Sequence, residues 1–257
     1  MSYTTELIMQ YIADLMLPFV RISALLVAMI GFSGKTVPTR VKALLALSIA
    51  FIVSPMVPSS GFTNLFSVEG FLMVIQQILI GVAIGFISQM FLNTFVMAGQ
   101  TIAVQSGLGF ATLVDPVNGI NTAAVGQFYI ILATLVFWAI DGHLAMIQML
   151  VYSFEAVPIG SGWLAADKIY QIVEWGKWLF IATITIALTP ITAMLIINLT
   201  FGIMTRAAPQ LNIFSIGFPI SQITGLIVVW ISLSAFMLHF ETIWESAAFL
   251  MCEIAGC

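Results

Sequence analysis

The feature that most limits the fold is the length of the uncharged apolar segments. Between Gly70 and Val114 the chain contains no Asp, Glu, Lys or Arg, and between Trp178 and Phe240 it contains only Arg206. Hydrophobic residues make up 61% of the 257 residues and charged residues 7%, whereas about 25% of the residues in a soluble domain are charged. Because about 20 apolar residues make a spanning helix, the sequence predicts an all-α integral membrane protein with about six long apolar helices.

Proline and glycine interrupt many of these segments, so we expect the helices to be kinked. Pro190 lies inside the apolar run at 178–204, and the run at 71–104 is too long for one ordinary helix. Asp141, Gly142 and His143 interrupt the apolar run from 123 to 157. That interruption predicts either a helical hairpin or one broken helix.

Four helical residues are candidates for close packing or for a polar role at membrane depth. Gly81 and Gly85 have the spacing that lets two helix backbones approach closely. Asp14 and Arg21 lie two helical turns apart and therefore share one helix face. They either face the protein interior, as charges at membrane depth normally do, or lie near the interface and extend toward water.

Basic residues cluster in one loop, which contains Lys35, Arg40 and Lys42. The positive-inside tendency puts this loop in the cytoplasm and the N-terminus outside. A count of six spans then puts Lys168 and Lys177 on an outer loop, against the same tendency. We therefore do not expect these helices to cross the bilayer as ordinary hairpins.

The sequence carries no pattern typical of an enzyme. It contains no Walker-type nucleotide-binding loop, no HExxH and no GxSxG. A net charge of −4 without a basic patch argues against nucleic acid as a partner. His143 and His239 are the only histidines, so no four-ligand metal set can be assembled. We expect no catalytic residue, no cofactor and no metal.

The two cysteines, Cys252 and Cys257, end the chain. They could pair with each other. The interpretation that we favour is two free thiols on a C-terminal tail.

A glycine-rich segment at 105–122 separates two apolar runs and contains Asp115 and Pro116. Such a segment suits neither a water-exposed loop nor a membrane helix, and we expect it to be buried in protein or to line a cavity at membrane depth. Leu108, Phe110 and Leu113 could form a compact apolar plug on this segment. Two other functions stay open: an autonomous secondary transporter that uses Asp14, Arg21 and Arg206, and a purely structural scaffold.

Two segments together resemble one known family. GLGFATLVDPVNG (residues 107–119) is similar to the central motif of the FliR family of type III secretion export-gate proteins, and MTRAAPQLNIFSIGFPI (residues 204–220) to its second signature. Pro18, Arg21 and the loop with Arg40 also fit the N-terminal pattern of this family. The resemblance covers essentially the whole chain. The flagellar branch is the better match, and the equivalent subunit of a virulence system stays an alternative.

The resemblance implies a non-enzymatic subunit of the flagellar export gate, located in the bacterial inner membrane at the basal body. Such a subunit assembles with FliP and FliQ subunits into a helical pore for unfolded flagellar proteins, beside FlhB and FlhA and in contact with membrane lipid. It also implies displacement of the assembly toward the periplasm. Within the single membrane domain, 1–257, residues 1–177 would be a P-like portion and residues 178–257 a Q-like helical hairpin.

The resemblance also implies roles for individual residues. The pore plug would consist of Gly107, Leu108, Gly109, Phe110, Leu113, Val114, Asp115, Pro116 and Gly119. The Q-like turn and its packing would involve Met204, Arg206, Pro209, Gln210, Asn212, Gly217 and Pro219.

Overall fold

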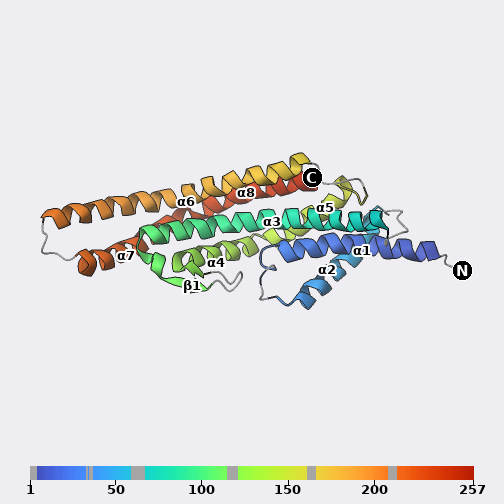
Figure 1. Cartoon of the computed structure of the whole chain (residues 1–257), viewed down its shortest axis with the longest axis horizontal. Helices are drawn as coiled ribbons and strands as arrows, with labels where there is room; N and C mark the ends of the chain where they lie inside the picture. Colours follow the sequence, from blue (N-terminus) through green and yellow to red (C-terminus); the bar gives the residue numbers. More distant parts are fainter. Residues whose placement is uncertain are drawn as a thin grey trace. The chain divides into compact units, whose positions relative to one another are not determined.

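The computed structural model describes residues 5–32, 34, 37–58, 67–114, 121–160, 166–207 and 213–257, and these residues are mainly helical (Figure 1). An apolar chain forms helices because a bilayer offers no hydrogen-bond partners to backbone N–H and C=O groups. The α-helices are α1 (Thr5–Ala28), α2 (Thr39–Val53), α3 (Val68–Gln105), α4 (Ala124–Ala139), α5 (Gly142–Ala156), α6 (Ala166–Ala207), α7 (Ile213–Ser232) and α8 (Phe236–Ala255). The shorter elements are the 3-10 turns η1 (Ser54–Met56), η2 (Leu108–Phe110) and η3 (Leu233–Ala235) and the strands β1 (Thr112–Val114) and β2 (Asn121–Ala123).

The helices confirm the predicted class of protein. Among the described residues, 5 helical segments are long and apolar enough to cross a membrane, and the broken pair α4 and α5 raises the number to 6. The chain is therefore an all-α membrane protein, apart from one short two-stranded hairpin. The segments are Ile8–Ala28, Thr39–Met56, Val68–Gln105, Ala166–Ala207 and Gly217–Ala255.

Helix lengths differ from the expectation at two places. The expectation that the run at 71–104 exceeds one helix is wrong, since α3 is a single helix of 38 residues. At about 1.5 Å per residue, a helix of that length extends well beyond the roughly 30 Å core of a bilayer. The helix α6 has 42 residues and continues past Pro190. Lys168 and Lys177, which the count of six spans puts on an outer loop, both lie in the first part of this helix.

The predicted interruption at Asp141 is present. The helix α4 ends at Ala139, and α5 begins at Gly142. Asp141 has a left-handed backbone with φ 57°, which is uncommon for a residue other than glycine and stops a helix. A side chain at Gly142 would collide with the ring of Phe137, so glycine at this position allows the chain to turn tightly.

The chain forms two compact units, each built from segments that are distant in sequence. The first unit contains Met1–Met90, Phe137–Trp175 and Ser246–Cys257, and the second contains Phe91–Val136 and Gly176–Glu245. The division of the sequence into a P-like and a Q-like portion concerns likeness to other subunits, and it stays a prediction.

In the first unit, α1 packs closely against α3 at the two glycines of the GxxxG pattern. A Cβ atom at Gly81 would collide with the backbone oxygen of Arg21, and one at Gly85 would lie 2.5 Å from the Cβ atom of Ala28. Real Cβ atoms do not approach other atoms so closely, so only glycine permits this helix separation.

In the second unit, aromatic rings from three helices form the core. Phe95 of α3 lies 5.3 Å from Phe236 and 5.7 Å from Phe240 of α8, measured between ring centroids. Tyr129 of α4 lies 6.0 Å from Phe236 and shares a hydrogen bond of 3.1 Å with Ser232. Such aromatic pairs add about 0.5–1.5 kcal/mol each to the effect of burial alone.

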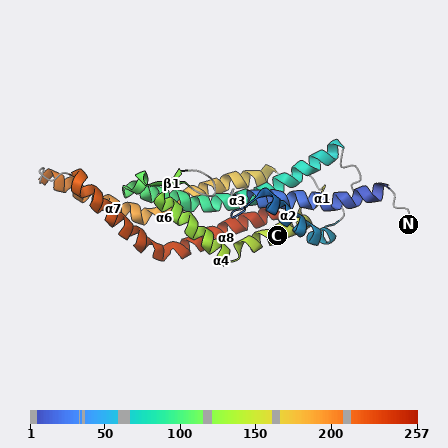
Figure 2. The ribbon, with the colours of Figure 1, turned by 90° about the horizontal axis from the view of Figure 1, so that it is seen from below.

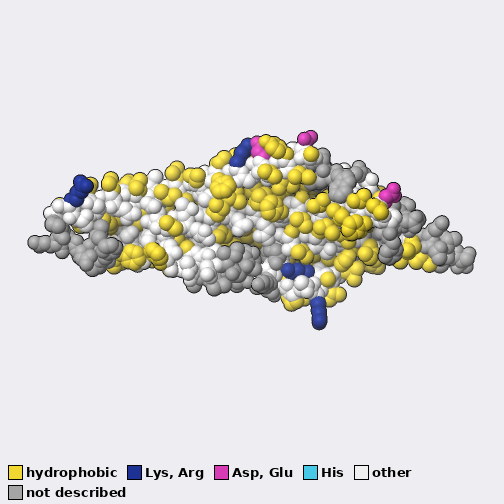
Figure 3. All heavy atoms as spheres, in the orientation of Figure 1, with side chains coloured by type: hydrophobic (Ala, Val, Ile, Leu, Met, Phe, Trp, Pro, Cys, Tyr) yellow, Lys and Arg dark blue, Asp and Glu magenta, His cyan; other side chains and the backbone are white. Residues whose placement is uncertain are grey.

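The helix α7 reverses the direction of α6 and leads through η3 into α8, a course that Figure 1 and Figure 2 both show. Large apolar side chains remain exposed on several helices, for example Phe51 of α2 at 74%, Trp230 of α7 at 73% and Phe249 of α8 at 72%. Figure 3 shows apolar side chains over much of one face, with few charged ones among them. Apolar exposure on this scale suits contact with lipid or with partner subunits.

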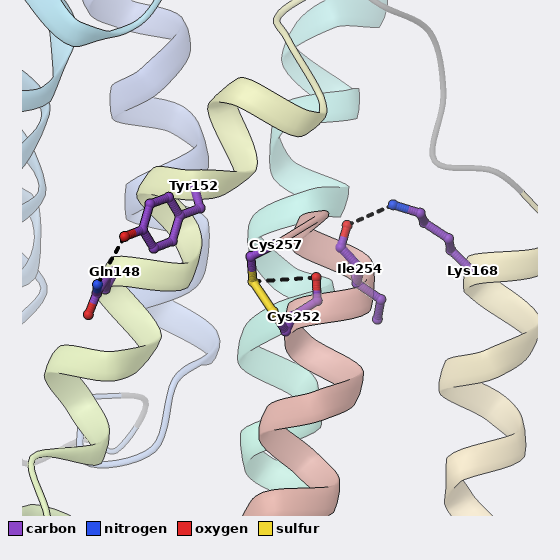
Figure 4. Close-up of a disulfide and its surroundings, with 6 residues drawn as sticks. All are labelled: Gln148, Tyr152, Lys168, Cys252, Ile254 and Cys257. Carbon is purple, nitrogen blue, oxygen red and sulfur yellow. Dashed lines mark hydrogen bonds between the residues drawn. A yellow bond between two sulfur atoms is a disulfide. The ribbon is translucent and has the colours of Figure 1, made fainter.

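The expectation of two free thiols on a tail is wrong, because a disulfide joins Cys252 and Cys257 at the end of α8 (Figure 4). Gly256 has φ 83°, and the N–H groups of Gly256 and Cys257 both donate to the carbonyl oxygen of Cys252, at 2.7 and 3.0 Å. This glycine-terminated turn brings Cys257 back over Cys252. The ammonium of Lys168 donates to the carbonyl of Ile254 at 3.0 Å and so caps the same helix end.

Candidate functional site

The segment predicted as a plug begins where α3 ends. Gly107 has φ 73°, a left-handed conformation that ends the helix and that glycine adopts without strain. A Cβ atom at this position would also lie 3.2 Å from the ring of Phe218 in α7. Leu108, Gly109 and Phe110 then form the 3-10 turn η2.

On either side of residues 115–120, the segment forms two short paired strands, which we call the hairpin. The strand β1 pairs with β2 in antiparallel register, with Thr112 opposite Ala123, Leu113 opposite Thr122 and Val114 opposite Asn121. One further bond, from the N–H of Ala124 to the carbonyl of Ala111 at 2.8 Å, closes the base of the hairpin. The predicted plug residues Asp115, Pro116 and Gly119 lie outside the described residues.

The base of the hairpin is anchored on both sides. On the return strand, buried Thr122 donates a hydrogen bond of 3.2 Å to the side chain of buried Gln127. Beyond it, Gly126 of α4 lies against Gly99 of α3, where a Cβ atom on Gly99 would lie 2.6 Å from the Cα atom of Gly126. Both ends of the segment therefore leave from closely packed helices of the second unit.

Phe110 is exposed, whereas Thr122 and Gln127 at the base of the hairpin are buried. Its side chain is 90% exposed in the chain, the highest value among the exposed large hydrophobic residues of the described part. This chain by itself does not cover Phe110, and the expectation that the segment lies buried in protein or lines a cavity stays a prediction. An exposed phenylalanine on an anchored hairpin is available to a surface outside this chain.

The helix α7, which begins within the second signature segment, packs against the end of α3. Gly217 and Gly225 are both buried, and a side chain at Gly225 would collide with Ser106 at the end of α3. Ser106 is fully buried, and its hydroxyl donates to the carbonyl of Ile102 at 2.9 Å. Pro219 lies inside α7, in an exposed position.

The turn before α7 is described only in part. Met204 and Arg206 are exposed in the last turns of α6. Pro209, Gln210 and Asn212 lie outside the described residues. The polar groups of the two signature segments therefore do not form a catalytic cluster within the described residues. Across the same residues, no group of His, Cys, Asp and Glu could hold a metal ion.

Arg21 forms the most polar site in the interior of the first unit. Its side chain is fully buried, which answers the question left open by the sequence: this charge faces the protein interior. The guanidinium donates to Gln77 Oε1 at 2.7 Å, to the carbonyl and hydroxyl of Ser153 at 2.8 and 3.0 Å, and to the carbonyl of Val157 at 2.9 Å. It also lies 4.3 Å from the centroid of the Phe154 ring.

These contacts join α1, α3 and the end of α5 around one side chain. All the hydrogen-bond acceptors of Arg21 among the described residues are uncharged. Hydrogen bonds to neutral groups, rather than an ion pair with one of these acceptors, therefore fix the position of the guanidinium. Asp14 is half-buried, and its backbone oxygen accepts a hydrogen bond of 3.1 Å from Ser54. Sequence reasoning missed the partners of Arg21, because polar side chains on separate helices carry no sign of their contact in sequence.

Comparison with known proteins decides the family. Residues 12–247 match the family of bacterial export proteins, family 1. The chain belongs to this family. The resemblance to FliR is thereby confirmed, and the match extends over the hairpin, both signature segments and Arg21.

Several relatives are each described as flagellar biosynthetic protein FliR. The chain is 37% identical to the protein of Pectobacterium carotovorum over 244 residues, which cover 95% of this chain and 93% of the relative. It is also 37% identical to the Escherichia coli K12 protein over 209 residues, with 81% and 80% covered. The Bacillus subtilis protein is 25% identical over 222 residues, with 85% of each chain covered.

Membership of an export family and the long apolar helices make this chain a membrane component of a bacterial export system. The description of the family names export, not an enzymatic reaction. A component of such a system works with other parts of the apparatus.

Proposed function

We propose that this export-family chain is the R-type subunit of the flagellar type III export gate in the inner membrane. In this proposal it forms, together with FliP and FliQ subunits, the pore through which unfolded flagellar proteins leave the cytoplasm. Full-length similarity to several FliR proteins supports the flagellar branch over a virulence system. The chain itself supplies structure, and other components provide the energy for export.

The observation that carries the proposal is the hairpin with Phe110. A phenylalanine that is 90% exposed on a hairpin with an anchored base gains about 1.5–3 kcal/mol when a partner or a pore lumen buries it. Residues 107–119 then act as the plug of the pore, with Phe110, Leu108, Leu113 and Val114 excluding water and ions. The glycines of this segment allow the backbone to turn and to move when cargo passes.

The same proposal assigns the remaining parts of the chain. Residues 1–177 correspond to a P-type subunit, and residues 178–257 to a Q-type hairpin whose turn lies near Arg206. FlhB and FlhA adjoin the gate, and the assembly lies toward the periplasmic side of the membrane. Exposed apolar side chains on α6, α7 and α8, such as Leu199, Trp230 and Leu238, supply surface for neighbouring helices.

Native mass spectrometry tests the assembly. The tagged chain is purified from cells that also express P-type and Q-type subunits. One copy of the chain in a larger complex with both partners is the expected result. A stable species without partners that takes up a solute in vesicles would instead favour an autonomous transporter, and loss of that uptake on neutralisation of Arg206 would confirm it.

A shortened hairpin tests the plug separately. Deletion of residues from 107–119 in the assembled gate is expected to let small solutes leak across the membrane. A gate that assembles normally with this deletion and keeps an unchanged permeability barrier would contradict the plug, but not the role as a subunit.

A further inference from the structure

A pocket in the first unit lies between α1 and the beginning of α2, away from the hairpin in sequence. Its volume is about 510 Å³. The residues that line it are Ser23, Val27, Gly34, Val37, Pro38, Thr39, Lys42 and Ala43. This lining is mostly apolar and contains one cationic side chain.

That cation, Lys42, is only 8% exposed. Its Nζ atom donates one hydrogen bond, to the carbonyl of Gly34 at 3.2 Å. An ammonium carries three N–H donors, and the carbonyl of Gly34 is the one polar partner that Lys42 has among the described residues. A buried cation costs free energy unless an anion or several acceptors compensate for the lost water. Among the described residues that line the pocket, none is acidic.

The beginning of α2 adds to the same positive field. Pro38 occupies the N-cap position and makes no side-chain capping bond, and the first turn of α2 contains no acidic residue. Backbone N–H groups at a helix start attract anions, since they lack partners within the helix and carry the positive end of the helix dipole. Thr39 and Pro38, which line the pocket, belong to this helix start.

The apolar side of the pocket continues onto the surface of α2. Val27, Val37 and Ala43 line the pocket. Leu44, Leu47 and Phe51, which follow along α2, are 65%, 46% and 74% exposed. Since α2 belongs to a segment long enough to cross the membrane, these side chains suit hydrocarbon. A ligand for this arrangement needs an anionic head group next to Lys42 and an apolar tail along α2. A phospholipid has both parts.

We propose that this pocket binds an anionic phospholipid, with its phosphate next to Lys42 Nζ and the start of α2 and its acyl chain along α2. Lys42, in the first turn of α2, belongs to the basic cluster of the sequence, which the positive-inside tendency puts on the cytoplasmic side. Anionic lipids bind basic pockets between membrane helices on that side. The bound lipid compensates for the buried charge and fastens the α1–α2 connection to the membrane.

Lipid retention by the full-length chain tests the proposal. The protein is reconstituted in nanodiscs of phosphatidylcholine with a minor share of phosphatidylglycerol, extracted in mild detergent, and analysed by native mass spectrometry. The expected result is one retained phosphatidylglycerol in preference to phosphatidylcholine. Lys42→Met is expected to reduce this retention about tenfold, because a charge-assisted hydrogen bond is lost.

Two further variants distinguish a pocket from general surface charge. Arg40→Met removes the same formal charge from an exposed residue outside the pocket lining, and retention is expected to stay within about twofold. Lys42→Arg keeps a cation at the site and is expected to retain the lipid. Equal losses in Arg40→Met and Lys42→Met would overturn the proposal in favour of diffuse attraction.

A variant that fills the pocket keeps the test decisive if Lys42→Met fails to fold. Ala43→Phe leaves Lys42 unchanged but occupies the pocket, so retention is expected to fall in protein that still elutes as a single species. Retention equal to that of the unchanged chain would overturn the proposal. Displacement of the lipid by inorganic phosphate alone would also overturn it, since the acyl chain would then contribute nothing.

Discussion

At the scale of single residues, Arg21 shows how one charge can organise an apolar interior. A buried guanidinium needs several acceptors, and here they come from Gln77, Ser153 and Val157. Gln77 uses its oxygen for this contact, and its Nε2 atom is buried without a partner among the described residues. The arginine therefore acts as a structural centre for three helices, rather than as a charge free to move with a transported solute.

Replacement of this centre is expected to be costly. Arg21→Met leaves the acceptors on Gln77 and Ser153 buried and unpaired, and we expect the free energy of unfolding to fall by about 3 kcal/mol. Arg21→Lys recovers only part of the loss, because an ammonium cannot reproduce the planar set of donors. Thermal unfolding in detergent, followed by tryptophan fluorescence, measures both. The exposed Arg40→Met is the control, and an equally small effect at Arg21 would contradict the structural role.

Phe110 is expected to affect leakage through the assembled gate rather than the stability of the isolated chain. Because its side chain is 90% exposed, Phe110→Ala is expected to change the stability of the isolated chain by less than about 0.5 kcal/mol. In the assembled gate it is expected to raise leakage of small solutes. Phe249→Ala, at another exposed phenylalanine, should not. Buried Phe95→Ala should cost about 3–5 kcal/mol in the same stability measurement. Lower assembly without leakage would favour a scaffold over a plug.

At the scale of elements, glycines decide where helices end and how closely they approach. Gly107 ends α3 in a left-handed conformation, which puts the hairpin at the end of a 38-residue helix. Gly85 and Gly225 have a different role, since they allow other helices to pack against α3. A side chain would be unfavourable at all three positions. The cause at Gly107 is strain in the left-handed backbone, and the cause at Gly85 and Gly225 is collision with a neighbouring residue.

A pair of alanine variants separates strain from helix propensity. Gly107→Ala is expected to destabilise the chain by about 1–2 kcal/mol, because alanine must adopt a left-handed backbone. Gly176 lies inside α6, and a Cβ atom there would meet nothing within 4 Å, so Gly176→Ala is expected to stabilise by up to about 1 kcal/mol. Melting temperatures of the two variants should move in opposite directions. A rise in both would show that the end of α3 does not need a left-handed residue.

The disulfide at the end of α8 closes a very short loop. Because Cys252 and Cys257 are 5 residues apart, the constraint on the unfolded chain is small, and Cys257→Ser is expected to lower stability by about 2 kcal/mol at most. The hydrogen bonds of the helix end and the cap from Lys168 are independent of the sulfur atoms. Unfolding with and without reductant measures the contribution. Labelling of both thiols in the native, unreduced chain would contradict the bond itself.

At the scale of the whole molecule, the two compact units interleave along the chain. The C-terminal segment Ser246–Cys257 belongs to the same unit as Met1–Met90. Trp175 donates to Ser246 at 3.2 Å, and Gly256 lies so close to Ala156 that a side chain at Gly256 would collide with it. A P-like portion defined in sequence therefore does not coincide with a unit defined by packing.

Fragments test this interleaving. Residues 1–177 expressed alone lack the segment that packs against Trp175 and Ala156, and we expect them to aggregate or to be degraded. Co-expression of residues 178–257 is expected to restore a complex that co-purifies and melts cooperatively. A monodisperse, cooperatively folded fragment 1–177 would show that the first unit does not need its C-terminal segment.

The class of protein and the family could both be predicted from the order of residues alone. Long uncharged apolar segments allow few folds besides membrane helices, and the two signature segments carried the resemblance to FliR. The breaks at Gly107 and Asp141 were also readable, because glycine and short polar residues mark helix ends through local backbone energy.

Contacts between residues that are distant in sequence became known from the folded chain. The acceptors around Arg21, the pocket around Lys42 and the exposure of Phe110 all depend on how separate helices pack, and no local pattern encodes that. The disulfide likewise required the turn at Gly256 to bring two sulfur atoms together. Packing between helices depends on contacts across the whole chain, whereas helix formation in an apolar setting depends on each segment alone.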